Sequence, residues 1–279
     1  MIIDSHVHFW DPARGDDILI VRRERALQRR FYPEDLRPQL DAAGVDRCVV
    51  IQSAPQGDET RHLLDLVRDL PWVHGVVGWV DLESEDVADT LAALRAAGPL
   101  LGVRVMLHRL DDESWINRPT VGRGLRALCA AGLSLDLITE PRHINTVRAA
   151  LIAVPDLRAI VNHGATPPIA SGVFEPWAAD LTHLARDTRA WCKFSGLREV
   201  AGSDPNDARI LPYARHMLDA FGPRRLLYAS NWPVCDLAGG HAQWWASALA
   251  ILDHLGVLGA DREAMFGGNA PQAYRKASV

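Results

Sequence analysis

The chain has 279 residues, of which 48% are hydrophobic and 23% charged, and its formal net charge is -5. This composition is typical of a globular protein with a full core, and the slightly acidic balance argues against nucleic acid or an anionic membrane as a partner. The four cysteines are scattered, no apolar run has the length of a membrane span, and no signal-peptide pattern opens the chain, so we expect a cytoplasmic protein with reduced thiols.

Strand-like and helix-like segments alternate from one end of the chain to the other. The predicted strands, each a short apolar run, are residues 1–8, 47–52, 73–81, 101–107, 133–139, 157–163, 190–195 and 225–230. The predicted helices are residues 33–43, 57–70, 84–97, 119–131, 141–154, 175–186, 206–221, 240–255 and 262–275. Several strands are apolar without alternation, as expected where both faces of a parallel sheet are buried.

Eight successive strand–helix units predict a parallel sheet with right-handed crossovers. In a chain of 279 residues this pattern favours an α/β fold of the TIM type, a closed (β/α)8 barrel. We find no linker and no internal repeat, so residues 1–279 are predicted to form a single domain. The alternative is an open doubly wound sheet, which is disfavoured because no Gly-x-Gly-x-x-Gly follows any strand.

The first predicted strand ends in a histidine pair, within Asp4-Ser5-His6-Val7-His8. Side chains two positions apart on a strand point to the same face, so His6 and His8 lie together, with Asp4 below them. Two imidazoles at a strand end can hold one divalent metal ion or an anionic oxygen of a ligand. The alternative is a pair of core histidines, but the shared face and the terminal position favour a functional site.

Polar side chains also concentrate at the ends of the other strands, where (β/α)8 barrels carry their functional residues. His163, at the end of the sixth strand, would add a third imidazole to the same rim. Arg104 lies inside an apolar run, so it must pair either with a structural carboxylate or with an oxygen of a ligand. Gln52 ends the second strand with a single amide, which is a less specific signal. Asp4 and Asp136 could orient a histidine.

The segment between the first strand and the first helix, residues 11–31, is long and rich in arginine. A connection of this length is more often functional than a plain link. We therefore expect it to cover the mouth of the barrel.

These motifs together carry a resemblance to a known family. The chain opens with IDSHVHFWD at residues 3–11, and there follow YPEDL (32–36), QSAP (52–55), GVVGWVDL (75–82), GVR (102–104), HGATPPI (163–169), KFSGL (193–197), WPVC (232–235) and FGGNA (266–270). Over nearly its whole length the sequence resembles the sugar lactonases in the amidohydrolase 2 branch of the amidohydrolase superfamily. The resemblance implies a distorted (β/α)8 barrel that works with one zinc-like divalent metal or without metal. It also implies an Asp on the eighth strand that takes a proton from the attacking water.

The sequence departs from this family pattern where chemistry is expected. Asn231 stands at the position of the eighth-strand Asp, and the other departures are Asn162 for an Asp, Thr166 for a Lys and Val105 for a His. An amide does not accept a proton near neutral pH, so Asn231 cannot act as a general base. Either another group, such as His163, His8 or a metal centre, activates the water, or the substrate differs, or the protein no longer catalyses.

The sequence therefore predicts a hydrolase of carbohydrate metabolism whose small-molecule partner is a lactone, most simply a sugar-acid lactone. The predicted catalytic groups are His163 and Asn231, and the predicted ligands of a zinc-like metal are His6, His8 and His163. The predicted substrate-binding groups are Arg104, Gln52 and three apolar walls, Trp10, Trp79 and Trp232. The alternatives are a metal-dependent decarboxylase of an unsaturated acid, which needs no water nucleophile, and a catalytically impaired ligand-binding barrel. The oligomeric state stays open between a monomer and a homodimer.

Overall fold

Parallel strands form the centre of the molecule. The computed structural model describes residues 1–275. The strands are β1 (Ile3–Val7), β2 (Arg47–Ile51), β3 (Val73–Gly78), β4 (Leu100–Met106), β5 (Ser134–Ile138), β6 (Arg158–Val161), β7 (Trp191–Phe194) and β8 (Leu226–Tyr228). They form one eight-stranded sheet in which each strand pairs with the next, in the order β1 to β8.

Backbone hydrogen bonds after β8 bring the two edges of the sheet together. The Asn231 N–H donates to the carbonyl of His6 at 2.9 Å, and the His8 N–H donates to the carbonyl of Trp232 at 2.8 Å. The sheet therefore closes at its carboxyl end, which confirms the predicted barrel and excludes the open doubly wound sheet. Strands β6 to β8 have only three or four residues, and the register shifts in the pairings from β1 to β4, so the barrel is distorted.

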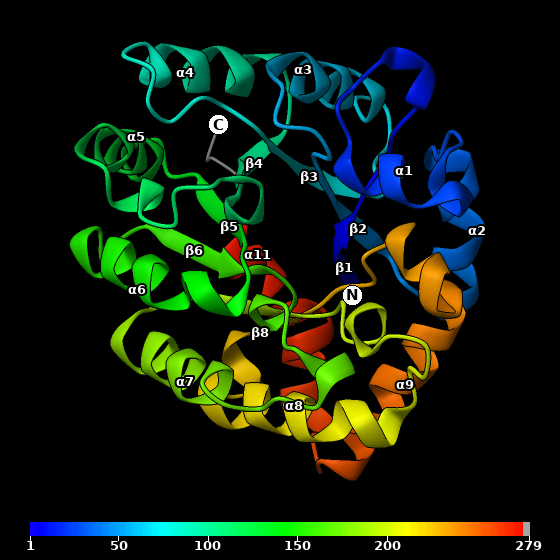
Figure 1. The fold of residues 1–279 in the computed structure, drawn as a ribbon. Helices are drawn as coiled ribbons and strands as arrows, with labels where there is room; N and C mark the ends of the chain where they lie inside the picture. Colours follow the sequence, from blue (N-terminus) through cyan, green and yellow to red (C-terminus); the bar gives the residue numbers. More distant parts are fainter. Residues whose placement is uncertain (276–279) are drawn as a thin grey trace.

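Helices surround the strands, as Figure 1 shows. The α-helices are α1 (Leu19–Arg23), α2 (Pro33–Ala43), α3 (Gly57–Leu66), α4 (Val87–Ala97), α5 (Pro119–Ala130), α6 (Ile144–Ala153), α7 (Trp177–Asp187), α8 (Asp207–Phe221), α9 (Gly240–His254), α10 (Gly259–Glu263) and α11 (Ala270–Ala273). Pro33 opens α2, where a missing N–H costs no hydrogen bond, and Gly44 ends it with φ 68°. None of the helices within residues 1–275 is both long and apolar enough to cross a membrane.

Some helix ends differ from the sequence prediction. Helix α4 begins after Asp86 rather than at Ser84. The predicted helix 262–275 is divided into α10, a π-helical turn at Ala264–Gly268, and α11. Gly267 lies in that turn because a Cβ atom there would overlap the carbonyl of Met1. The last residues of the predicted domain, 276–279, lie outside the described residues.

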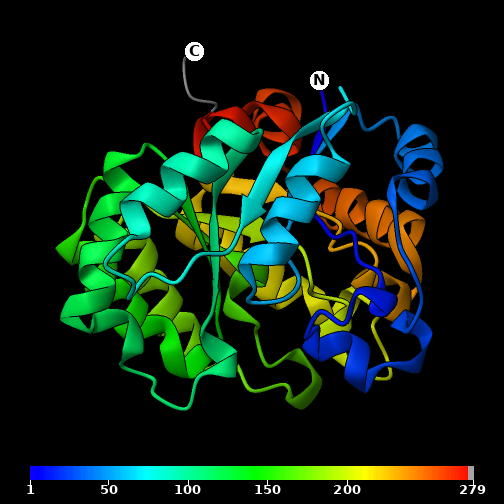
Figure 2. The same cartoon turned by 90° about the horizontal axis from the view of Figure 1, so that it is seen from above.

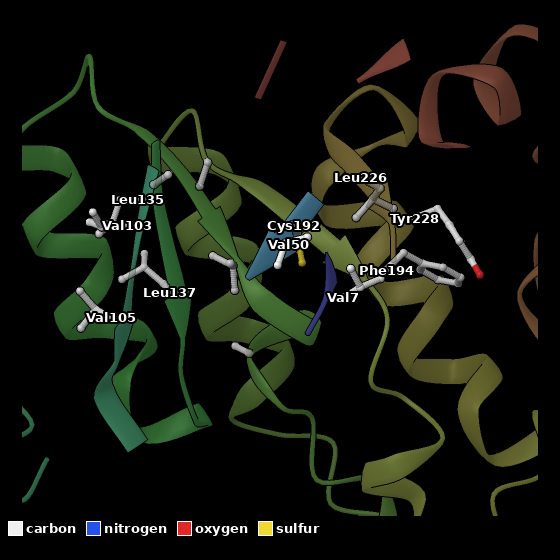
Figure 3. Packing of buried hydrophobic residues seen from close by; sticks show 14 of the residues in the cluster. Val7, Val50, Val103, Val105, Leu135, Leu137, Cys192, Phe194, Leu226 and Tyr228 are labelled. Carbon is white, nitrogen blue, oxygen red and sulfur yellow. The ribbon is translucent and has the colours of Figure 1, made fainter. Parts of the chain in front are cut away.

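The apolar core has an outer and an inner layer. Figure 3 shows part of the outer layer, in which side chains from β4 and β5 lie between the strands and the helices: Val103, Val105, Leu135 and Leu137. The inner layer joins barrel residues to the C-terminal segment: Ile3, Val49, Ile51, Val77, Leu101, Ile160 and Leu227 pack with Ala270, Ala273 and Tyr274. Figure 2 shows α11, in red, on the side of the molecule where the N-terminus lies. The C-terminal segment therefore plugs the amino end of the barrel.

Residues 11–31, which we call the covering segment, lie toward the opposite end of the barrel, in dark blue in Figure 2. Both ends of the segment are tied together, because Trp10 and Phe31 exchange backbone hydrogen bonds of 3.0 and 2.9 Å. The Trp10 indole donates to the Arg29 carbonyl at 3.1 Å. Arg109, which follows β4, binds the Asp17 carboxylate at 2.6 Å and holds the segment from the other side.

Candidate active site

His6 and His8 meet at the carboxyl end of β1. Their Nε2 atoms are 3.0 Å apart. Nδ1 of His6 lies 2.8 Å from the Lys193 amine, and Nδ1 of His8 lies 2.8 Å from the carbonyl of Ile51. One set of tautomers satisfies every bond, with Lys193 donating to His6, His6 to His8, and His8 to the carbonyl. Burial lowers the pKa of both histidines, so both rings are neutral near pH 7.

His163 follows β6 and brings a third ring against His6. The centroids of these two rings are 4.6 Å apart. Nδ1 of His163 lies 2.7 Å from the hydroxyl of Ser195, which leaves Nε2 as the nitrogen available to a ligand. Burial, with the charges of Lys193 and Arg104, lowers the pKa of His163 and keeps this ring neutral as well. The three imidazoles therefore form one cluster, as the sequence predicts.

The position of His163 depends on an unusual backbone. Its φ of 52° lies in the left-handed region, which few residues other than glycine adopt. Gly196 provides the space beside it, because a Cβ atom at Gly196 would lie 2.8 Å from Cβ and Cγ of His163. Gly196 itself has φ 70°, so a side chain at this position is excluded by both conformation and space. Strain of this kind is typical of functional sites.

A buried ion pair lies next to the histidine cluster. The Lys193 amine is 2.5 Å from Oδ2 of Asp136, and neither side chain has any exposed surface. The Tyr274 hydroxyl donates to Asp136 at 2.9 Å, and the Asn162 amide donates to it at 3.1 Å. Burial lowers the pKa of Lys193 to about 8, against the opposing effect of Asp136, so the amine is mostly charged at pH 7. Asp136 therefore orients His6 through Lys193 rather than by direct contact.

Arg104 reaches the site from β4. Its guanidinium donates to the carbonyl of Gln52, and the Gln52 amide donates back to the carbonyl of Arg104 at 3.2 Å. Burial lowers the pKa of Arg104 to about 10, so the group stays charged at pH 7. Within residues 1–275 it forms no ion pair with a carboxylate, and its Nε has no hydrogen-bond partner. These donors are placed to bind oxygen atoms of a ligand.

Asn231 follows β8 on the other side of the cluster. Its φ of 62° is a left-handed conformation that Asn and Asp tolerate better than other side chains. Its side-chain amide donates to Oε1 of Glu199 at 2.9 Å. Burial raises the pKa of Glu199, and the hydrogen bond from Asn231 opposes that change. The side-chain amide of Asn231, at the position where the resemblance implies an Asp, is thus hydrogen-bonded directly to the carboxylate of Glu199.

These groups line a cavity of about 370 Å³ at the carboxyl end of the barrel. Its polar wall includes His8, Ser53, Arg104, His108, His163, Thr166, Glu199 and Asn231, together with Arg23 and Glu24 of the covering segment. Its apolar wall includes Ile18, Leu19 and Ile20 of the covering segment, with Met106, Ile138, Val200, Val234 and Leu237. The covering segment therefore lies over the mouth of the barrel, as expected from its length. A cavity of this size suits a small ligand.

Most predicted site residues meet at this cavity, but the tryptophans need a correction. Trp10 lines it, whereas Trp232 has no exposed surface and packs against the rings of Phe9 and Phe31 at 6.2 and 5.5 Å. Trp232 therefore belongs to the core and does not contact a ligand. Trp79 is half-buried and lies outside the set of residues that line the cavity.

Two further predictions change in detail. Gln52 is fully buried and supports Arg104 through the backbone, so its contribution to substrate binding is indirect. His6 lies behind the cavity wall and touches it through His8 and His163.

Glu199 and His108 line the cavity, and neither belongs to the predicted set of site residues. Glu199 lies six positions after Lys193, in the loop after β7, where no motif marks a functional carboxylate. The signal for it was indirect, since a missing carboxylate at Asn231 calls for another one nearby. His108 follows β4, and burial lowers its pKa to about 4, so it is neutral at pH 7.

His6 and His8 could supply two of the four ligands of a tetrahedral metal ion. Neutral imidazoles bind zinc at about 2.0–2.1 Å in tetrahedral geometry, which places two ligand nitrogens about 3.3 Å apart. The Nε2 atoms of His6 and His8 are 3.0 Å apart, and Nδ1–H of His8 donates to a carbonyl, as in metal-binding histidines. A metal on Nε2 of His6 would move the proton of that ring to Nδ1, where Lys193 would have to be neutral to accept it. Within residues 1–275, however, no three His, Cys, Asp or Glu side chains are arranged to hold a metal. The third predicted ligand, His163, keeps its Nε2 available because Nδ1 lies beside Ser195, and its ring is tilted 56° to that of His6, so the set of three ligands stays a prediction.

A (β/α)8 barrel with a histidine pair at the end of its first strand defines an enzyme of the amidohydrolase type. The family model described as amidohydrolase matches residues 3–276, so the chain belongs to this family and the predicted family is confirmed.

Two curated relatives are L-fucono-1,5-lactonases. The one from Burkholderia ambifaria is 40% identical over 277 residues, which cover 98% of this chain and 95% of the relative. The one from Burkholderia multivorans is 31% identical, with the same shares covered. The reaction class that the sequence predicts, hydrolysis of a lactone, is the one for which these relatives are named.

Solved structures agree with this assignment. An amidohydrolase from Burkholderia multivorans with bound HEPES has a TM-score of 0.92 at 29% identity and covers 99% of both chains. A second structure of an amidohydrolase from this organism, with bound zinc, has a TM-score of 0.91, also at 29% identity and over 99% of both chains. A divalent metal is therefore compatible with the family and with the His6–His8 pair of this chain.

Proposed function

We propose that the protein hydrolyses the lactone of a 6-deoxy sugar acid, of the L-fucono-1,5-lactone type, to the open-chain acid. The observation that carries this proposal is the composition of the cavity, which neutral imidazoles and the charged Arg104 line together with apolar side chains. The curated relatives named for this reaction support the substrate class. Lactone hydrolysis needs a polarised carbonyl, an activated water and a proton for the ring oxygen that leaves.

Each of these tasks has a residue at the cavity. Arg104 is charged, and it donates hydrogen bonds to the oxygens of the lactone. His163 is neutral, so its Nε2 can accept a proton and deliver it to the departing ring oxygen, while Ser195 holds the ring through Nδ1. His6 and His8 would hold a divalent metal, which would polarise the carbonyl as a Lewis acid.

The apolar wall accounts for the choice of a 6-deoxy sugar. Ile18, Ile20 and Leu237 line the cavity, and their side chains offer no hydrogen bond to a substrate. A methyl group on the lactone ring fits such a wall, whereas a hydroxymethyl group would bury its hydroxyl without a partner. That loss is worth about 1–3 kcal/mol, or a factor of about 5–150 in kcat/KM.

A pH-indicator assay with a panel of aldonolactones tests the proposal. We expect acid release to be fastest with 6-deoxy 1,5-lactones, and at least about fivefold slower with the 6-hydroxy counterparts. Release of carbon dioxide from an unsaturated acid without ring opening would instead establish the decarboxylase. Tight binding of lactones without turnover, with zinc supplied, would establish a ligand-binding barrel.

A further inference from the structure

The pair formed by Asn231 and Glu199 carries an inference about the activation of water. The Asn231 amide donates to Glu199 at 2.9 Å, and the Asn231 backbone N–H donates to the His6 carbonyl at 2.9 Å. Glu199 is thereby attached to the strand that carries the histidines. Both residues line the cavity beside His163.

We infer that Glu199 is the general base that activates the attacking water. This inference rests on the proposed lactonase function. Asn231 has no proton-accepting group of suitable basicity, so its role is to hold the Glu199 carboxylate through the amide. The other carboxylate at the cavity wall is Glu24, which belongs to the covering segment rather than to the barrel. Of the two carboxylates that line the cavity, Glu199 is therefore the one that hydrogen bonds tie to the barrel strand carrying the histidines.

The environment of Glu199 suits this task. Burial raises its pKa, so the carboxylate is a stronger base than one in water, and the hydrogen bond from Asn231 opposes that rise. The neighbouring Arg198 is engaged elsewhere, since its guanidinium binds the Ala238 carbonyl at 2.9 Å and Ser247 at 3.1 Å. His163 is then free to serve the leaving oxygen rather than the water.

The proton and electron balance of the step is simple. Glu199 takes a proton from water while the water oxygen forms a bond to the lactone carbonyl carbon. The protonated Glu199 passes this proton to Nε2 of the neutral His163, and the resulting imidazolium gives it to the ring oxygen. The tetrahedral oxyanion collapses as the bond from the carbonyl carbon to the ring oxygen breaks, so both groups return to their starting states and the product is the hydroxy acid.

Exchange of the amide and the carboxylate tests this role. Glu199→Gln is expected to lower kcat by about 100-fold or more with little change in KM, as loss of a general base does. In the double variant Glu199→Gln with Asn231→Asp, the carboxylate and the amide of the hydrogen-bonded pair change places. We expect kcat of this double variant to be at least about tenfold higher than kcat of Glu199→Gln alone. Asp tolerates the left-handed backbone at this position, so the exchange is compatible with the fold.

A second variant and a control complete the experiment. Glu199→Ala is expected to regain rate when formate is supplied, because formate can replace the missing carboxylate. Glu83→Gln removes a carboxylate outside the cavity that accepts hydrogen bonds from Trp115 and Thr120, and it should leave kcat within about threefold of the wild type.

Each outcome decides the question. A Glu199→Gln variant with wild-type kcat overturns the inference, and so does a loss of rate that neither the exchange nor formate relieves. If the wild-type protein itself opens no lactone in the same assay, the proposed function fails first, and the inference falls with it.

Discussion

Replacement of Lys193 by Met tests the buried network next to the histidines. The amine lies 2.5 Å from Asp136, and both side chains are fully buried. Removal of one partner leaves Asp136 as a buried charge with only the Tyr274 hydroxyl and the Asn162 amide to stabilise it. Loss of one member of such a pair costs about 3–5 kcal/mol of unfolding free energy. For a protein of ordinary stability, this loss is a large part of its unfolding free energy.

A double variant separates the charge from the packing. Lys193→Met combined with Asp136→Asn removes both charges, so the unfolding free energy should return to within about 2 kcal/mol of the wild type. The control is Arg189→Met, which breaks an ion pair with Asp156 whose side chains are 84% and 83% exposed. That variant should cost less than about 1 kcal/mol.

Urea unfolding followed by circular dichroism supplies these free energies, and lactone hydrolysis supplies the activities. Both Lys193 variants should lose about 10–100-fold in activity, even where stability is restored, because Nδ1 of His6 no longer has its donor. The reasoning is refuted if Lys193→Met unfolds within about 1 kcal/mol of the wild type, or if the effects of the two substitutions simply add.

Three further predictions concern other parts of the site. Gly196→Ala should displace the His163 ring and lower kcat/KM about 100-fold. The control is Gly132→Ala, where φ is also positive at 68° but the added Cβ meets open space, so this variant should lose stability and keep its activity. Equal activities of the two variants would contradict the prediction. Arg104→Lys should raise KM for the lactone about tenfold or more, since hydrogen bonds from a charged group are worth about 1.5–3 kcal/mol, and an unchanged KM would remove Arg104 from substrate binding. Burial raises the pKa of Glu59 from 4.5 to about 7, so the folded state binds more protons than the unfolded state in this range. Glu59 should therefore contribute a fall of about 3 kcal/mol to the unfolding free energy as the pH rises from 4.5 to above 7, while the buried histidines, whose pKa is lowered, contribute a rise. Glu59→Gln should lack this fall in urea titrations at several pH values, and a parallel pH dependence would show that Glu59 is not its source.

The fold was predictable from the sequence because its signals are local and repeated. Each strand is a buried apolar run, and each is followed by a helix, so the (β/α)8 topology follows from the order of the elements alone. The positions of His6, His8 and His163 follow from the same rule, since functional side chains collect at the carboxyl ends of barrel strands. The breaks in the last helix were harder to predict, because Gly267 responds to the distant carbonyl of Met1.

The remainder of the site depends on contacts between distant segments. Trp232 follows β8 as a functional residue would, yet the rings of Phe9 and Phe31 enclose it completely. Glu199 carries no motif, and its place beside Asn231 is set by the path of the loop after β7. Periodicity and strand order do not determine such loop paths, so these contacts require the structure.

The rate of lactone hydrolysis by a His163→Ala variant tests the central claim most directly. The measurement is kcat/KM for L-fucono-1,5-lactone with zinc supplied, compared with the wild type and with His216→Ala. His216 is a matched control because it lies on α8, where its Nε2 is 2.7 Å from the Ala178 carbonyl, away from the residues that line the cavity. We predict that His163→Ala falls by about 100-fold or more while His216→Ala stays within about threefold. Wild-type turnover by His163→Ala would contradict the account.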